Sequence, residues 1–109
     1  MQAYTKQDIL EEAIKTTADR GLNYGKPEDN FKRIARRWNV HMLNRYGIVT
    51  ELDEHDVAMM MVDLKVARLE NAPTHHDSWV DAAGYAACGG SMPAPEPAPA
   101  DGIYKGLVS

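Results

Sequence analysis

The segment from residue 52 to residue 70 constrains the fold more than any other part of the chain. When its residues are placed at about 100° intervals, as in an α-helix, apolar side chains cover well over half of the circumference. A helix of this kind must be covered on several sides, by neighbouring helices or by another subunit. We therefore expect Met60 and Leu64 to face the core of the monomer. Met59, Val62 and Val66 are expected at an interface between subunits.

Two helices are predicted before this segment, and no strand is predicted anywhere. The first helix begins at a capping box in which Thr5 and Asp8 satisfy each other's backbone N–H groups. Gly21 is placed to end this helix, because glycine adopts the conformation that commonly follows a last turn. The second helix begins at Pro27, a favoured first residue, and stays amphipathic to about Arg45.

A fourth helix is predicted from His76 to about Cys88, followed by the proline-rich stretch "SMPAPEPAPADG". Residues 1–90 are expected to form a helical bundle domain, and residues 91–109 a proline-rich linker with a C-terminal peptide. The predicted class is all-α, as a four-helix, mostly antiparallel bundle with a C-terminal arm. At 109 residues the core is modest, so we expect a homo-oligomer.

Charge and composition exclude several classes of partner. The net charge is −4, whereas nucleic-acid-binding domains usually carry a basic surface. No apolar run approaches the roughly 20 residues that span a bilayer, and the N-terminus is too acidic for a signal peptide. The single Cys88 fits a reducing compartment. We expect no nucleic-acid partner, no membrane partner and a cytoplasmic location, in the host if the protein is phage-encoded.

Two cations stand within the apolar arc of the third helix. Lys65 and Arg68 lie about one turn apart there, and Asp77 and Asp81 follow after one short loop. Cations in such a position must be paired, must reach water along their stems, or must meet a ligand. One interpretation is an internal ion network with the two acids. The other is a pocket in which the cations hold an anion, since arginine and lysine suit phosphate.

The acids share a helix face with Tyr85, because the three positions recur every four residues. Asp77 also fits a capping box with Thr74, whereas Asp81 lies one turn further in and has no such explanation. Tyr85 either donates to a ligand or lines the core. The polar loop between the first two helices is expected at the mouth of the site. The expected ligand-binding residues are Lys65, Arg68, Asp77, Asp81, Tyr85, Arg20, Tyr24 and Asn30.

A metal is not required by this pattern, but a Mg²⁺ site is conceivable. Mg²⁺ is bound through one or two carboxylates together with waters and substrate phosphates. The acids of the first helix are predicted on its solvated side, and the paired histidines before the fourth helix are expected to be polar surface. We expect no cofactor for a binding protein, and Mg²⁺ only for an enzyme. Its ligands would then be Asp77, Asp81, Glu11 and Glu12.

The blocks "NYGKPEDNFKRIARRW", "DVAMMMVDLKVARL" and "DSWVDAAGYAACGG" resemble a family of small proteins encoded by bacteriophages and prophages, over roughly residues 8–90. More loosely, the layout is similar to the all-α nucleotide pyrophosphohydrolases of the MazG and dimeric dUTPase kind. The resemblance implies helical oligomers that hydrolyse nucleoside triphosphates with Mg²⁺, held partly by an "EExxD" motif. Here "DSWVD" keeps two acids, as Asp77 and Asp81, and "DLKVAR" has cations where the preceding helix would supply acids.

These observations leave functions of different classes open. The resemblance and the cations favour a phage-type protein that sequesters a nucleotide, or a cyclic-nucleotide-like signal, without turnover. Such a protein would be an inhibitor of host antiviral signalling. The alternative is a Mg²⁺-dependent, MazG-like nucleoside triphosphate pyrophosphohydrolase. A third option is a structural or host-protein-binding module that uses the helical faces and the arm.

Overall fold

The computed structural model describes residues 3–94, apart from the side chains of residues 22–24. This part of the chain forms four α-helices and no strand, which confirms the predicted all-α class. None of the described helices combines the length and the apolar character that crossing a bilayer requires. The predicted arm lies almost wholly outside the described residues. The helices are α1 (Lys6–Tyr24), α2 (Pro27–Tyr46), α3 (Glu54–Asn71) and α4 (His76–Ser91).

The start of α1 is confirmed and its predicted end is wrong. Asp8 N–H donates to Thr5 Oγ1 at 3.0 Å, and Thr5 N–H donates to Asp8 Oδ2 at 2.9 Å. This backbone donor, with the Thr5 hydroxyl, holds the pKa of the Asp8 carboxyl below its usual value. Gly21 does not stop the helix, since an interior glycine costs only about 1 kcal/mol. The helix ends at Gly25, whose φ of 82° suits glycine.

The boundaries of α3 and α4 also differ in part from the predictions. α3 begins at Glu54 because Asp53 accepts hydrogen bonds from the next turn and forms a capping box with Asp56. α4 begins at His76 as predicted and continues three residues beyond Cys88. The N-cap of α4 is His75 without a side-chain cap bond. The predicted capping box of Thr74 and Asp77 is therefore wrong.

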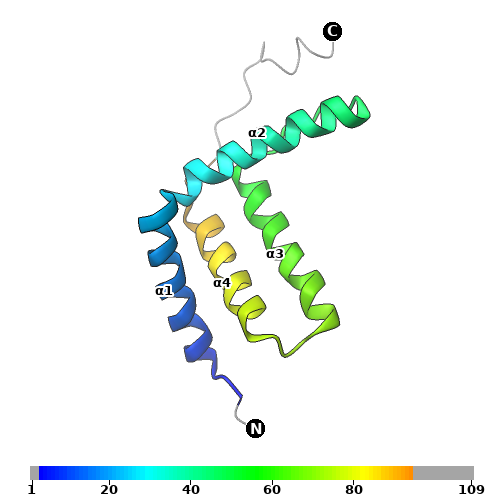
Figure 1. Cartoon of the computed structure of the whole chain (residues 1–109). Coiled ribbons are helices and arrows are strands. Elements are labelled where there is room, and N and C mark those ends of the chain that lie inside the picture. The colour runs from blue at the N-terminus through cyan, green and yellow to red at the C-terminus, as the bar shows by residue number, and fades with distance from the viewer. Residues whose placement is uncertain (1–2, 95–109) are drawn as a thin grey trace.

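Three of the helices form a layer, and the fourth crosses one end of it (Figure 1). α4 lies between α1 and α3 and packs on both. α3 runs antiparallel to α4, whereas α1 runs in the same direction as α4 (Figure 1). α2 crosses the end of the layer, packs mainly on α3 and extends past it. The structure confirms four packed helices, but α2 is a crossing helix rather than a fourth antiparallel member.

The main core lies where α2 meets α3. Phe31 and Ala35 of α2 are buried together with Val57 and Ala58 of α3. Asn39 of α2 holds the loop before α3: its side chain accepts from Thr50 Oγ1 and Leu52 N–H, at 2.6 and 3.0 Å, and donates to the Leu52 carbonyl at 3.1 Å. Because this buried amide satisfies loop backbone groups, it fixes the angle between the two helices.

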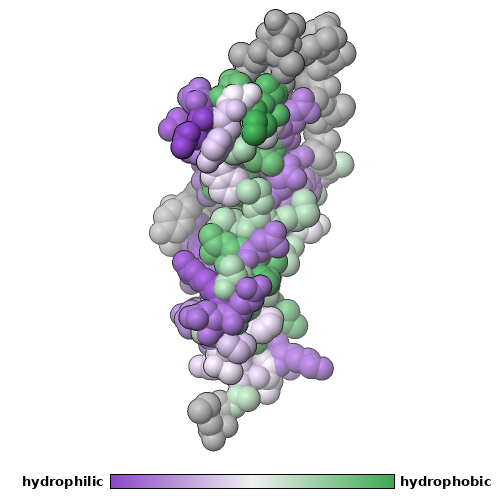
Figure 2. All heavy atoms as spheres, turned by 90° about the vertical axis from the view of Figure 1, so that its right-hand side faces the viewer, coloured by the Kyte–Doolittle hydropathy of each residue, from purple (hydrophilic) through white to green (hydrophobic). Residues whose placement is uncertain are grey.

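Part of the apolar arc of α3 stays uncovered. Met60 and Leu64, predicted to face the core, are each 42% exposed, so that prediction is wrong. Met59 and Val66 are 58% and 45% exposed. The reason is the layer itself: α3 lies at its edge, with α4 on one side and α2 at one end (Figure 1). Figure 2 shows apolar patches among polar ones on the face of the molecule that includes this edge.

A close approach of α3 and α4 depends on Gly89. A Cβ at Gly89 would lie 2.8 Å from Ala58 Cβ, which is closer than two such atoms can approach. A Cβ at the next residue, Gly90, would have no neighbour within 4 Å. The two adjacent glycines of α4 therefore differ in the space that they require.

We predict that Gly89→Ala lowers the free energy of unfolding by about 1–3 kcal/mol, because the added methyl group forces the two helices apart. Gly90→Ala should leave the free energy of unfolding unchanged or raise it by roughly a few tenths of a kcal/mol, because alanine has a higher helix propensity than glycine. Urea denaturation followed by circular dichroism measures both. Equal stabilities of the two variants would show that the helices do not approach each other at Gly89.

Candidate functional site

A buried ion pair joins α3 to α4. Lys65 Nζ lies 3.0 Å from Asp81 Oδ2, and the two side chains are 10% and 20% exposed. The carboxylate that faces Lys65 directly offsets part of the cost of removing both groups from water. The structure thus brings together two of the residues that the sequence singled out.

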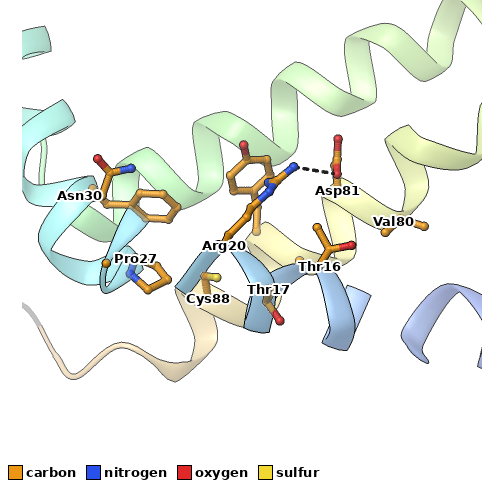
Figure 3. A pocket seen from close by; sticks show the side chains of 12 residues that line it. Thr16, Thr17, Arg20, Pro27, Asn30, Val80, Asp81 and Cys88 are labelled. Atoms are coloured by element: carbon orange, nitrogen blue, oxygen red, sulfur yellow. Dashed lines mark ion pairs between the residues drawn. The ribbon is translucent and has the colours of Figure 1, made fainter. Parts of the chain in front are cut away.

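Asp81 has a second cationic partner, which comes from α1. Arg20 Nη2 lies 3.5 Å from Asp81 Oδ1, and the Arg20 side chain is 48% exposed. Figure 3 shows the guanidinium group reaching from α1 toward Asp81 on α4. Lys65 and Asp81 balance each other, so the group of three carries an excess positive charge on the solvent-accessible arginine.

Two of the residues predicted for this site lie elsewhere. Arg68 is exposed and forms no ion pair with the described residues, so its expected place in the network is wrong. Three helical residues turn about 60° short of a full circle, which moves Arg68 from beside Lys65 to the open surface. Asp77 is also exposed, one turn before Asp81 on α4. The side chain of Tyr24 lies outside the described residues.

Beside Arg20 and Asp81 is a cavity of about 120 Å³ between α1, α2 and α4. Phe31 and Tyr85 contribute aromatic rings whose centroids are 6.1 Å apart and whose planes are tilted by 35°. Asn30 contributes an amide, as the sequence predicted for the mouth of a site. The described residues that line it are Thr16, Thr17, Arg20, Gly25, Pro27, Asn30, Phe31, Val80, Asp81, Gly84, Tyr85 and Cys88.

Several lining residues were not predicted from the sequence. Thr16 and Thr17 precede Arg20 by one turn, and this spacing on α1 was the available signal that they share its face. Gly84 is buried where α4 faces α1, and a Cβ there would lie 3.4 Å from Thr17 Cγ2, which is about ordinary van der Waals contact. Cys88 was expected to be a packed thiol, and burial does raise its pKa, against the smaller opposite effect of Arg20.

A second polar cluster lies on α1 and α4, one helical turn before the residues of these helices that line the cavity. Glu12 of α1 and His76 of α4 form a hydrogen-bonded pair between the Glu12 carboxylate and His76 Nε2. The Glu12 side chain is 43% exposed, in line with its predicted place on the solvated side of the first helix, but its pairing with His76 was not predicted. Glu11 is exposed and accepts only a local bond, from Gln7 at 2.9 Å. Asp77 lies with this cluster: each of the three side chains offers a ligand atom, and these atoms lie within 4.8 Å of one another.

The two cationic partners of Asp81 should contribute very differently to stability. Lys65→Met leaves Asp81 with its more distant partner only, and should lower the free energy of unfolding by about 1–3 kcal/mol. Arg20→Met removes a half-exposed pair and should cost less than about 1 kcal/mol. Thermal and urea unfolding of both variants measure the difference. Equal losses would contradict the assignment of the buried pair as the structural one.

The chain matches known phage proteins along most of its length. The family described as "Domain of unknown function (DUF6378)" matches residues 8–93. The Gene 55 protein of Mycobacterium phage D29 is 39% identical over 83 residues, which cover 75% of this chain and 51% of that protein. The Gene 55 protein of Mycobacterium phage L5 is 38% identical over 90 residues, which cover 77% and 54%. The chain thus spans about half the length of these curated relatives. No solved structure matches it significantly.

Proposed function

The chain belongs to the DUF6378 family and has relatives encoded by phages, and we propose that it binds a nucleotide in the cavity without hydrolysing it. The observation that carries this proposal is the pair of cations on Asp81. Lys65 already balances Asp81 at 3.0 Å, so Arg20 can move from its longer 3.5 Å contact to a phosphate at little cost. A guanidinium group can hold two phosphate oxygens at once.

The lining of the cavity suits the other end of a nucleotide. The rings of Phe31 and Tyr85 offer apolar surface against which a base can pack, and Asn30 offers both a donor and an acceptor. Mostly apolar walls with a few placed polar groups are typical of small-molecule sites. The volume of about 120 Å³ is below the roughly 300–1,000 Å³ of sites that enclose a whole ligand. A base would therefore enter the cavity, with its phosphates outside beside Arg20.

The acidic side chains at the cavity favour binding of a nucleotide without hydrolysis. Asp81 is the one carboxylate among the described residues that line the cavity, and both of its oxygens face cations. Mg²⁺-dependent hydrolysis of a nucleoside triphosphate needs free carboxylates that hold the ion against the phosphates. A protein with this site would instead remove a nucleotide, linear or cyclic, from solution. In an infected cell its ligand would be a regulatory or antiviral nucleotide signal.

We predict that Arg20→Met weakens nucleotide binding more than tenfold, which corresponds to a charge-assisted hydrogen bond of about 1.5–3 kcal/mol. Isothermal titration with a panel of linear and cyclic nucleotides, with and without Mg²⁺, measures this. A bound base should also protect Cys88 from alkylation, because this single cysteine lines the cavity. Arg68→Met is the matched control and should bind normally.

Three outcomes would contradict the proposal. Equal nucleotide affinities of the Arg20→Met and Arg68→Met variants would show that the nucleotide does not bind beside Arg20 at the cavity. If no nucleotide of the panel bound at millimolar concentration, the protein would not be a nucleotide-binding protein. Repeated release of pyrophosphate, abolished by Asp81→Asn, would establish the enzyme alternative in its place.

We also propose that the protein self-associates through the uncovered face of α3. Met59 and Val66 lie on one side of the exposed face of α3, and Met60 and Leu64 lie on the other side, with Asp63 between the two pairs. Several large apolar side chains exposed on one helix of a soluble protein commonly mark a contact with another protein. A second copy offers the same surface, and closed dimers built from one shared patch are the commonest oligomers.

Light scattering at micromolar concentration should give at least twice the 12.1 kDa mass of one chain. Val66→Glu should shift the protein toward the monomer, because a carboxylate would be buried without a partner at the interface. Lys15→Glu reverses an exposed charge on α1, at the other edge of the layer, and should leave the assembly intact. A monomer of the unaltered chain at these concentrations would overturn the proposal.

A further inference from the structure

We infer that Glu12, His76 and Asp77 form a binding site for a divalent transition-metal ion. Their ligand atoms, one from each side chain, lie within 4.8 Å of one another. Glu12 comes from α1 and the other two residues from the first turn of α4. A bound ion would therefore link the two helices. This inference is independent of the proposed nucleotide site.

The imidazole ring of His76 is held in place before any ion binds. It stacks on the Tyr4 ring with centroids 3.5 Å apart and planes 22° apart. Its side chain is 16% exposed. His76 Nε2 faces Glu12, while His76 Nδ1 is buried and has no hydrogen-bond partner. A ring fixed by stacking loses little further freedom when it coordinates a metal, which favours binding.

The set of donors indicates which ions would bind. One imidazole nitrogen and two carboxylates are the donor types found in zinc sites, where three protein ligands leave a position for water. Imidazole also suits cobalt and nickel, whereas Mg²⁺ and Ca²⁺ are bound mainly through oxygen. Two carboxylates beside one imidazole carry more negative charge than a protonated ring alone would balance. A divalent cation supplies the missing positive charge.

The site is separate from the cavity. Glu12 precedes Thr16 of the cavity lining by four residues, and Asp77 precedes Asp81 by four. Four helical residues span about 6 Å, so the two sites lie side by side along α1 and α4. Asp77 is exposed, which gives an ion access from solvent. Variants of one site can therefore be tested without altering the residues of the other.

Titration calorimetry of the tag-free full chain with Zn²⁺ tests the inference directly. We expect one Zn²⁺ per chain and a higher melting temperature with the ion, because it joins α1 to α4. Co²⁺ should give visible absorption bands that Zn²⁺ abolishes. Glu12→Gln, His76→Gln and Asp77→Asn should each weaken Zn²⁺ binding at least about tenfold, since loss of even an outer partner costs that much.

The matched controls are Glu11→Gln and His75→Gln. They remove the same chemical groups one residue away, where Glu11 contacts Gln7 and His75 contacts Ser78, and both should bind Zn²⁺ normally. Zn²⁺ binding that survives in all three site variants, or that His75→Gln weakens equally, would overturn the inference. So would no binding at millimolar Zn²⁺. Asp77→Asn alters an exposed side chain, so it remains informative if the other two variants fail to fold.

Discussion

The buried contact between Lys65 and Asp81 organises the rest of the described structure. It joins α3 to α4 at 3.0 Å with little access to water, and a charge in that position is tolerated only with such a partner. Because Asp81 accepts Lys65 through one oxygen, its other oxygen is left for Arg20 of α1. One carboxylate thereby connects three helices. The excess positive charge that results lies at the edge of the cavity, so the interaction that holds the layer together also creates its most distinctive surface.

The crossing of α2 makes the cavity possible. In a closed antiparallel bundle a fourth helix would cover the length of the layer. Here α2 crosses its end (Figure 1). Phe31 of α2 packs with buried residues of α3, and a cavity lies between α1, α2 and α4. Asn39 fixes this crossing through its bonds to the loop before α3. The same arrangement leaves one face of α3 without a covering helix, so the cavity and the exposed apolar surface have a common cause.

Periodicity predicted the helices well, but it could not predict which faces they bury. The capping box at Thr5 and the start of α4 followed from local chemistry that tertiary structure did not override. The pairing of Lys65 with Asp81 followed from the cost of burying a charge. Arg68 was misplaced because the apolar arc was assumed to be covered everywhere. The contact of Glu12 with His76 was missed because the two residues lie 64 residues apart in the sequence, and no local pattern indicates such a contact.

Native mass spectrometry of the protein, released gently from cells and then mixed with nucleotides, tests the central claim most directly. It reports the assembly and any bound small molecule in one spectrum. The account predicts an oligomer in which each chain carries one intact nucleotide, and an Arg20→Met protein that carries none. Chains of bare mass in the presence of millimolar nucleotides would contradict it. So would equal retention by the Arg20→Met protein, because the excess charge beside Asp81 would then have no part in binding.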